Sequence, residues 1–148
     1  MAHATYLENE IMNASSERLV QILYGLAIDA LQQAQKCIQE SDIPGRVRWI
    51  NKAFAVLVEL SNGLDFDAGK EIALNYASIY DYCRRQLLEA NHKQSIAILK
   101  EIASLLADLQ EAWQIVVTRI SAERTARFAS HEVLPSERAL AGCLDCLA

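Results

Sequence analysis

The pair of residues with the spacing of a metal site is Glu89 and His92, in the sequence EANH. Residues three apart share a helix face, and Glu-x-x-His is the spacing by which di-iron carboxylate bundles bind their metal. Such a site needs a second copy of the motif and two further buried glutamates, and the sequence offers neither. We therefore expect a solvated helix end here, and no metal or other cofactor.

A second chemistry open to His92 is phosphoryl transfer, because histidine-phosphotransfer domains are four-helix bundles with one exposed imidazole. Those domains hold the histidine in mid-helix among small residues, whereas His92 follows Asn91, a residue that commonly ends a helix. A histidine-phosphotransfer signalling domain therefore stays as the alternative function.

The sequence CLDC places Cys143 and Cys146 at Cys-x-x-Cys spacing. A zinc site requires two more ligands at a suitable distance, and His131 supplies at most one of them. The sequence also has no glycine-rich phosphate loop, nucleophile elbow or His-Glu-x-x-His motif. These motifs together indicate a protein that is not an enzyme.

Composition limits the classes of partner. The chain has 148 residues, a net charge of −5 and a pI near 5.2, which argues against nucleic acid because phosphate binding needs a field of lysines and arginines. We find no secretory signal and no apolar run long enough to cross a bilayer, so we expect a cytoplasmic protein without membrane insertion. The four cysteines are then expected to be reduced thiols.

Helical periodicity first appears after the serine pair at 15 and 16. Ser15 or Ser16 can cap a helix whose apolar stripe runs to about Gln39. The sequence DIPG follows, with Asp42 as a cap and a proline in the first turn, where its missing N–H costs nothing. A second helix is therefore expected from there to about Asn62.

Two more periodic segments follow. Asp65 or Asp67 can cap a third helix that ends at Asn91, and a fourth helix is expected from about Gln94 to about Phe128. No β-like alternation interrupts these segments, and their three short connections favour an antiparallel up-down four-helix bundle. We expect an all-α protein with a mobile N-terminal segment (1–14), the bundle (15–128) and a C-terminal extension (129–148) whose order the sequence does not define.

Apolar residues are more numerous than four amphipathic helices need. Two interpretations stay open, a generous core with wide apolar stripes or grooves between helices that are left partly exposed for a partner helix. The residues outside the primary stripes are Val20, Tyr24, Ile28, Val56, Val58, Leu60, Tyr82, Leu88, Ile115 and Val117.

Three tyrosines of the third helix illustrate the same surplus. Tyr76 and Tyr80 are four residues apart and share a face, whereas Tyr82 lies roughly 200° around the helix from Tyr80. We expect the first two to face inward or towards a groove edge, and Tyr82 to face a partner on the surface.

Three stretches together resemble the flagellar secretion chaperone (FliS) family. They are YLENEIMNASSERLVQILYGLAIDALQQA, LVELSNGLDFDAGKEIALNYASIYDYCRRQLLEAN and LLADLQEAW, in this order, and they cover Tyr6 to Trp113. The resemblance depends on the combination of a tyrosine before the serine pair, a Leu-Asp turn with Gly-x-Ile-Ala-x-Asn, a Tyr-x-Tyr, an Ala-Asn helix end and a closing tryptophan.

The resemblance implies a cytoplasmic export chaperone that binds the disordered C-terminal segment of flagellin. It implies further that the protein prevents premature polymerisation and delivers flagellin to an export gate component of the flagellar type III apparatus. Exposed apolar grooves can also pair two copies of a chain, so a weak homodimer is a further expectation.

The resemblance also implies that an N-terminal strip covers part of the bundle and is rearranged when flagellin binds. We predict that partners bind to this strip and to positions on the second and third helices. The predicted partner-binding residues are Tyr6, Leu7, Ile11, Ile50, Leu57, Leu64, Asn75, Tyr76, Ile79 and Tyr82.

Overall fold

The computed structural model describes the backbone of residues 2–13 and 15–147, and the side chains of residues 3–9, 11–12 and 15–130. The described residues form helices and no strand, which confirms an all-α bundle. The five helices are α1 (Ala2–Asn13), α2 (Ser16–Gln39), α3 (Ile43–Asn62), α4 (Phe66–Lys93) and α5 (Ile96–Leu147).

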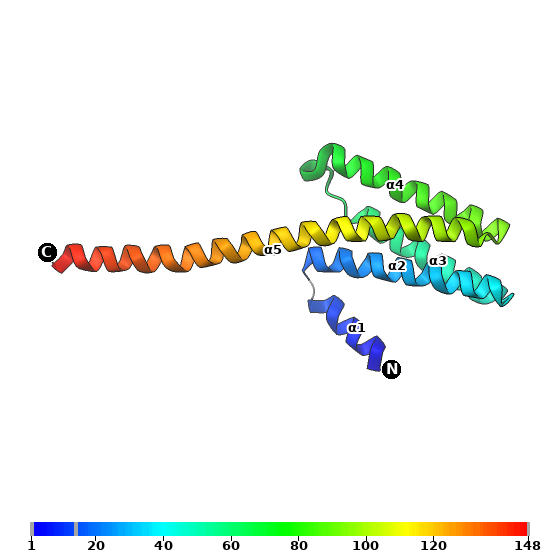
Figure 1. The fold of residues 1–148 in the computed structure, drawn as a ribbon, viewed down its shortest axis with the longest axis horizontal. Coiled ribbons are helices and arrows are strands. Elements are labelled where there is room, and N and C mark those ends of the chain that lie inside the picture. Colours follow the sequence, from blue (N-terminus) through cyan, green and yellow to red (C-terminus); the bar gives the residue numbers. More distant parts are fainter. Residues whose placement is uncertain (1, 14, 148) are drawn as a thin grey trace. The chain divides into compact units, whose positions relative to one another are not determined.

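The chain divides into two compact units, Met1–Trp113 and Gln114–Ala148. In the first unit, α2 packs against α3 and α3 against α4, and residues from the first half of α5 belong to the same core (Figure 1). The connections between α2, α3, α4 and α5 are short, which favours the predicted antiparallel order of neighbouring helices. The predicted residue ranges of the domains stay predictions.

The beginnings of α2 and α3 confirm the predicted caps. The Ser15 hydroxyl accepts a hydrogen bond from the backbone N–H of Arg18 at 3.3 Å, so Ser15 rather than Ser16 is the cap of α2. The Asp42 carboxylate accepts from the backbone N–H of Gly45 at 3.0 Å, one residue after the proline of the first turn. These side chains satisfy backbone donors that a helix start leaves without partners.

Two helix ends differ from the predictions. α4 continues two residues past Asn91, to Lys93, and stops at Gln94, whose φ of 50° is left-handed. α5 does not stop near Phe128 but continues to Leu147. Alanine and leucine are the most frequent residues in this last segment, and both have high helix propensity.

The core of the first unit is formed by hydrophobic residues, including the tyrosines Tyr24 and Tyr80, and no charged residue is buried among the described ones. Small side chains of α2 and α3 let these helices approach closely, since Ala27, Ala30, Ala34 and Ala53 are fully buried. Larger side chains fill the rest of the core. Those that are fully or almost fully buried include Leu31, Leu57, Leu87, Leu99, Ile102 and Leu106.

The wide core accounts for part of the apolar surplus. Tyr24, Val56 and Leu60, which fall outside the predicted stripes, are buried. The buried face of α2 and of α3 is therefore wider than a single stripe. In contrast, Leu88 stays 60% exposed on α4.

Candidate functional site

An apolar groove opens in the first unit where the beginning of α2, the end of α3 and the beginning of α4 come together. Its volume is about 640 Å³, and one side chain of α5 lies at its edge. A groove of this size with an apolar lining suits the apolar face of a helical segment. Apolar side chains in its lining include Leu19, Val20, Leu23, Leu64, Ile72 and Trp113.

The α2 wall of the groove was predicted only in part, since Val20 and Tyr24 were counted among the surplus apolar residues but Leu19 and Leu23 were not. Leu19 and Leu23 belong to the apolar stripe of α2, which we expected to enter the core, but both are only half-buried and line the groove. The same stripe is fully buried farther along, at Ala27 and Leu31. Periodicity identifies the stripe, but it does not tell where along the helix a neighbour covers it.

A kink in α4 forms part of the groove wall. The backbone of Lys70 has φ 47° and ψ −120°, and Figure 1 shows the bend near the beginning of this helix. A residue with a side chain adopts such a conformation at a cost of about 1–3 kcal/mol. Gly69 and Ala73, on either side of the kink, line the groove, and a Cβ atom added to Gly69 would lie 2.9 Å from the Cβ of Ala73. Glycine is therefore required for this close approach.

Two tyrosines meet at the floor of the groove. Tyr24 of α2 and Tyr80 of α4 are buried, their rings are 6.4 Å apart between centroids, and their hydroxyl groups form a hydrogen bond. The ring of Tyr76, one turn before Tyr80, lies 6.1 Å from it and also lines the groove. The prediction that Tyr76 and Tyr80 face inward or towards a groove edge is confirmed.

The hydroxyl pair is held in its neutral form. Burial raises the pKa of Tyr24 far above its usual range, and the hydrogen bond to Tyr80 raises it further. Burial also raises the pKa of Tyr80, to about 12. Both hydroxyls therefore keep their protons over the whole physiological pH range.

The charged residues in the groove lining are acidic. They are Glu59 at the end of α3 and Asp65, and both are exposed. Asp65 also caps α4, because its carboxylate accepts hydrogen bonds from the backbone N–H groups of Asp67 and Ala68 at 3.0 Å each. The electrostatic field at the rim of the groove is thus unfavourable to a carboxylate on a bound partner.

The predicted partner-binding residues of α4 and the connection before it include two that line the groove. Leu64 and Tyr76 line it. Ile79 is half-buried against the core, and Asn75 is exposed. The groove therefore includes two of these four predicted positions.

Two predicted positions on α3 lie inside the core. Ile50 is 2% exposed and Leu57 is fully buried. Both therefore contact the core of the bundle, and in this conformation a partner does not reach them. Their role in binding stays a prediction.

The N-terminal strip forms helix α1. Within it, Tyr6 is 67% exposed, Ile11 is 38% exposed and Leu7 is half-buried. No pattern in the sequence had indicated a helix before the serine pair. Whether the strip moves when a partner binds stays a prediction.

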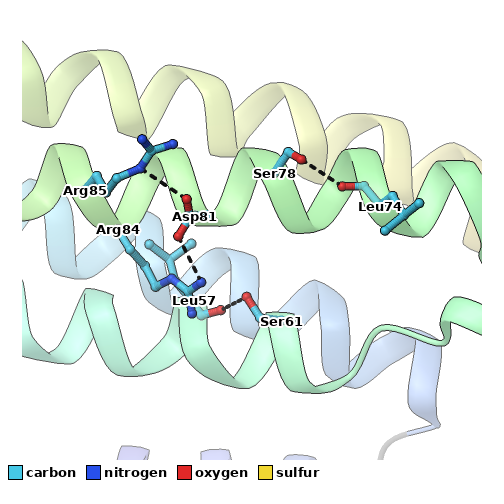
Figure 2. Close-up of polar contacts among 7 residues, drawn as sticks. All are labelled: Leu57, Ser61, Leu74, Ser78, Asp81, Arg84 and Arg85. Atoms are coloured by element: carbon cyan, nitrogen blue, oxygen red, sulfur yellow. Dashed lines mark hydrogen bonds and ion pairs between the residues drawn. The ribbon is translucent and has the colours of Figure 1, made fainter.

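Tyr82 lies outside the groove and is 37% exposed, and its contact with a partner stays a prediction. Its hydroxyl donates a hydrogen bond of 2.8 Å to the carboxylate of Glu101 on α5. The neighbouring Asp81 accepts from both Arg84 and Arg85, at 3.4 and 3.1 Å (Figure 2). This part of α4 therefore presents a polar surface, unlike the groove.

The residues considered for metal or phosphoryl chemistry do not come together. His92 is exposed in the last turn of α4, and Glu89 pairs with Lys93 in an ion pair that lowers the pKa of the Glu89 carboxyl group. Among the described residues, no group of three or more histidine, cysteine or carboxylate side chains has the arrangement of a metal site. Cys143 and Cys146 lie outside the described side chains, and Cys37 and Cys83 are buried free thiols.

None of the helices in the described part of the chain combines the length and the apolar character needed to span a membrane.

Comparison with known proteins gives consistent matches. The family model described as flagellar protein FliS matches residues 1–119. The chain is 32% identical over 116 residues to the flagellar secretion chaperone FliS of Salmonella typhimurium, which covers 78% of this chain and 86% of that protein. It is 30% identical over 107 residues to the flagellar secretion chaperone FliSB of Pseudomonas aeruginosa, covering 72% of this chain and 85% of the relative. It is also 28% identical over 107 residues to FliS of Vibrio cholerae, with 72% and 79% covered.

Proposed function

We propose a function from one premise: the chain belongs to the FliS family of flagellar secretion chaperones. On this premise, the protein is a non-enzymatic chaperone of the cytoplasm that binds the disordered C-terminal segment of flagellin. It prevents flagellin from polymerising prematurely and delivers it to the flagellar type III export apparatus.

The observation that supports this proposal is the apolar groove of about 640 Å³. A subunit that polymerises through an amphipathic, disordered end must have that end masked before export. A helical bundle with an open groove masks such an end by burying its apolar face as the segment becomes helical.

The proposal assigns separate roles to the predicted residues. Leu64 and Tyr76 contact the flagellin segment directly, because they line the groove, and Asn75 and Ile79 support it from the positions next to Tyr76 and Tyr80 in the sequence. Ile50 and Leu57 act from within the core, by holding α3 in place. Tyr82 lies on a separate, polar surface of α4, which suits contact with the export gate.

Calorimetry with two forms of flagellin tests the proposal. Full-length flagellin should bind with a strongly negative heat-capacity change and an unfavourable entropy, because binding buries apolar surface and orders a disordered segment. Flagellin without its C-terminal segment should not bind. Equal binding of both forms would contradict the proposal, and copurification of a response regulator instead of flagellin would favour the phosphotransfer alternative.

A further inference from the structure

The part of α5 that follows Trp113 leaves its apolar side chains uncovered. In residues 114–130, every described side chain is exposed or half-buried, and Ile115, Val116 and Phe128 are 58%, 43% and 73% exposed. A single helix cannot bury its own apolar residues, and helices in proteins owe most of their stability to the packing of such a face. These residues therefore need a partner that covers them.

The same stretch is basic. Arg119, Arg124 and Arg127, against the single acidic residue Glu123, give residues 114–130 a net charge of +2, whereas the whole chain has a net charge of −5. We call residues 114–130 the basic segment. Its charge is opposite to that of the rest of the chain.

The apolar and basic residues of this segment share one side of the helix. A helix turns about 100° per residue, so Ile115, Val116 and Ile120 fall within about 140° of its circumference. Arg119 and Arg127 lie within the same sector. A surface that covers this side must therefore be apolar and must carry acidic groups.

The groove of the first unit has both properties. Its volume is about 640 Å³ and its lining is mainly apolar, and the charged residues in that lining are Glu59 and Asp65, both exposed. An apolar groove accepts the apolar face of a helix, and acidic groups at its rim attract arginines. The groove and the basic segment are thus complementary in polarity and in charge.

The basic segment does not fill the groove of its own chain. No described residue after Trp113 lines that groove. α5 is one continuous helix from Ile96 to Leu147, so the chain has no turn after Trp113 by which the segment could fold back. A second copy of the chain is therefore the source of the occupant.

We propose that the basic segment of one copy occupies the groove of a second copy. Its apolar residues face the apolar walls, and its arginines lie at the rim beside Glu59 and Asp65. This contact joins different surfaces of the two copies, so each groove is filled only by the segment of another molecule. The inference goes beyond the proposed function, and its test needs no flagellin, so either can fail without the other.

Sedimentation of the full chain over a range of concentrations measures the self-association. At low salt, the average mass should rise above that of one chain, 16.5 kDa, as the concentration increases. Raising the ionic strength from about 0.05 M to about 0.5 M should weaken the association, because salt screens exposed charges. A chain that keeps the mass of one copy up to about 1 mM, the weak limit of specific binding, overturns the inference.

Charge reversal locates the contact on the segment. Arg119→Glu and Arg127→Glu together should weaken the association about tenfold, because two attractive contacts become repulsive. The matched control reverses two other exposed cations outside the groove, Arg48→Glu and Lys100→Glu, and should change the association little. It alters the net charge by the same amount. Equal weakening in both variants would mean that net charge alone drives the effect, which overturns the inference.

A charge exchange locates the contact at the groove. Glu59→Arg alone should weaken the association, and Glu59→Arg added to the reversed segment should restore it, because the opposite charges meet again with their signs exchanged. If the combined variant associates no better than the reversed segment alone, the segment does not bind at this groove.

A synthetic peptide of residues 114–130 keeps the test independent of folding in the variants. Added in excess to the unaltered chain, it should return the average mass to that of one copy, because it occupies the groove in place of the neighbour's segment. The same peptide with Arg119→Glu and Arg127→Glu should do so about tenfold less effectively. If the unaltered peptide leaves the association unchanged, the inference is wrong.

Discussion

Trp113 of α5 donates a hydrogen bond from its indole Nε1 to the backbone carbonyl of Glu17 in the first turn of α2, at 2.8 Å. The two residues are 96 positions apart in the sequence. Since Trp113 also lines the groove, this bond fixes both the start of α2 and one edge of the groove. Trp113 therefore stabilises the bundle and also determines the shape of the groove.

Trp113→Phe should lower the free energy of unfolding by about 1 kcal/mol, because the ring stays apolar but the hydrogen bond is lost. It should also weaken binding of the flagellin segment, since the groove edge is no longer fixed. Chemical denaturation and calorimetry measure the two effects. Trp49→Phe is the control, because Trp49 lies near the start of α3, away from the groove, and should not change affinity. Equal loss of affinity in both variants would contradict this role of Trp113.

The two serines at the start of α2 have different roles: Ser15 caps the helix, and Ser16 lines the groove. Ser15→Ala should lower the free energy of unfolding by roughly 0.5–2 kcal/mol, because the N–H of Arg18 loses its acceptor, and should leave flagellin affinity nearly unchanged. Ser16→Ala is the matched control and should not lower stability. Loss of affinity in a fully folded Ser15→Ala protein would mean that Ser15 contacts the ligand.

Much of the fold could be predicted because its signals are local. Asp42 and the proline two residues later define the start of α3, and Asp65 defines the start of α4, through backbone groups within three residues. The left-handed turn at Gln94 has no such signal, since glycine is the usual residue there. The sequence therefore placed the start of α4 accurately and its end two residues too early.

The site could be predicted only in part, because it depends on contacts between distant segments. Tyr24 and Tyr80 are 56 positions apart, and nothing in their local sequence pairs them. Ile50 and Leu57 have the same periodicity as groove residues, yet neighbouring helices cover them. The kink at Lys70 could not be predicted from the sequence either, because lysine has no preference for a positive φ.

Lys70→Gly should raise the free energy of unfolding by about 0.5–1 kcal/mol, because glycine adopts φ 47° without the clash of a Cβ atom and this gain outweighs its larger entropy loss on folding. Thermal and urea unfolding measure the change. Lys70→Ala is the control, since it removes the charge and keeps the Cβ atom, and it should not stabilise the protein. If both variants have the same stability, the backbone at this position is not strained.

The tyrosine pair should make stability fall at alkaline pH. Burial raises the pKa of Tyr80 to about 12 and also raises that of Tyr24, whereas an unfolded tyrosine ionises near pH 10. The folded state therefore holds more protons than the unfolded state above about pH 10, so stability is retained below that pH and lost as the pH rises through about 12. Urea unfolding at several pH values measures this loss.

The Tyr24→Phe, Tyr80→Phe double variant is the control for the pH experiment. Burial raises the pKa of Cys83 to about 11, so part of the alkaline loss remains in the variant. The two proteins differ in the slope of the free energy of unfolding against pH, and this difference is the contribution of the two tyrosines. Equal slopes would mean that the hydroxyl pair ionises as readily when folded as when unfolded.

The last prediction concerns α1 and the groove. α1 ends at Asn13, and Ser16, three residues later, lines the groove, so the chain can bring α1 to it. Tyr6 and Ile11 are exposed apolar residues on α1 that would gain by burial there. We expect α1 to compete with flagellin for the groove, which lowers apparent affinity by the fraction of closed molecules.

Deletion of residues 2–12 should therefore leave flagellin affinity equal or raise it, because a competitor is removed. In the full chain, hydrogen exchange separates displacement from direct contact, since it reports amide protection in α1 before and after flagellin binds. Protection should fall if flagellin displaces α1 from the groove. If protection rises and the deletion weakens binding, α1 is part of the interface. If neither changes, Tyr6, Leu7 and Ile11 belong to a structural tail and have no place in the binding site.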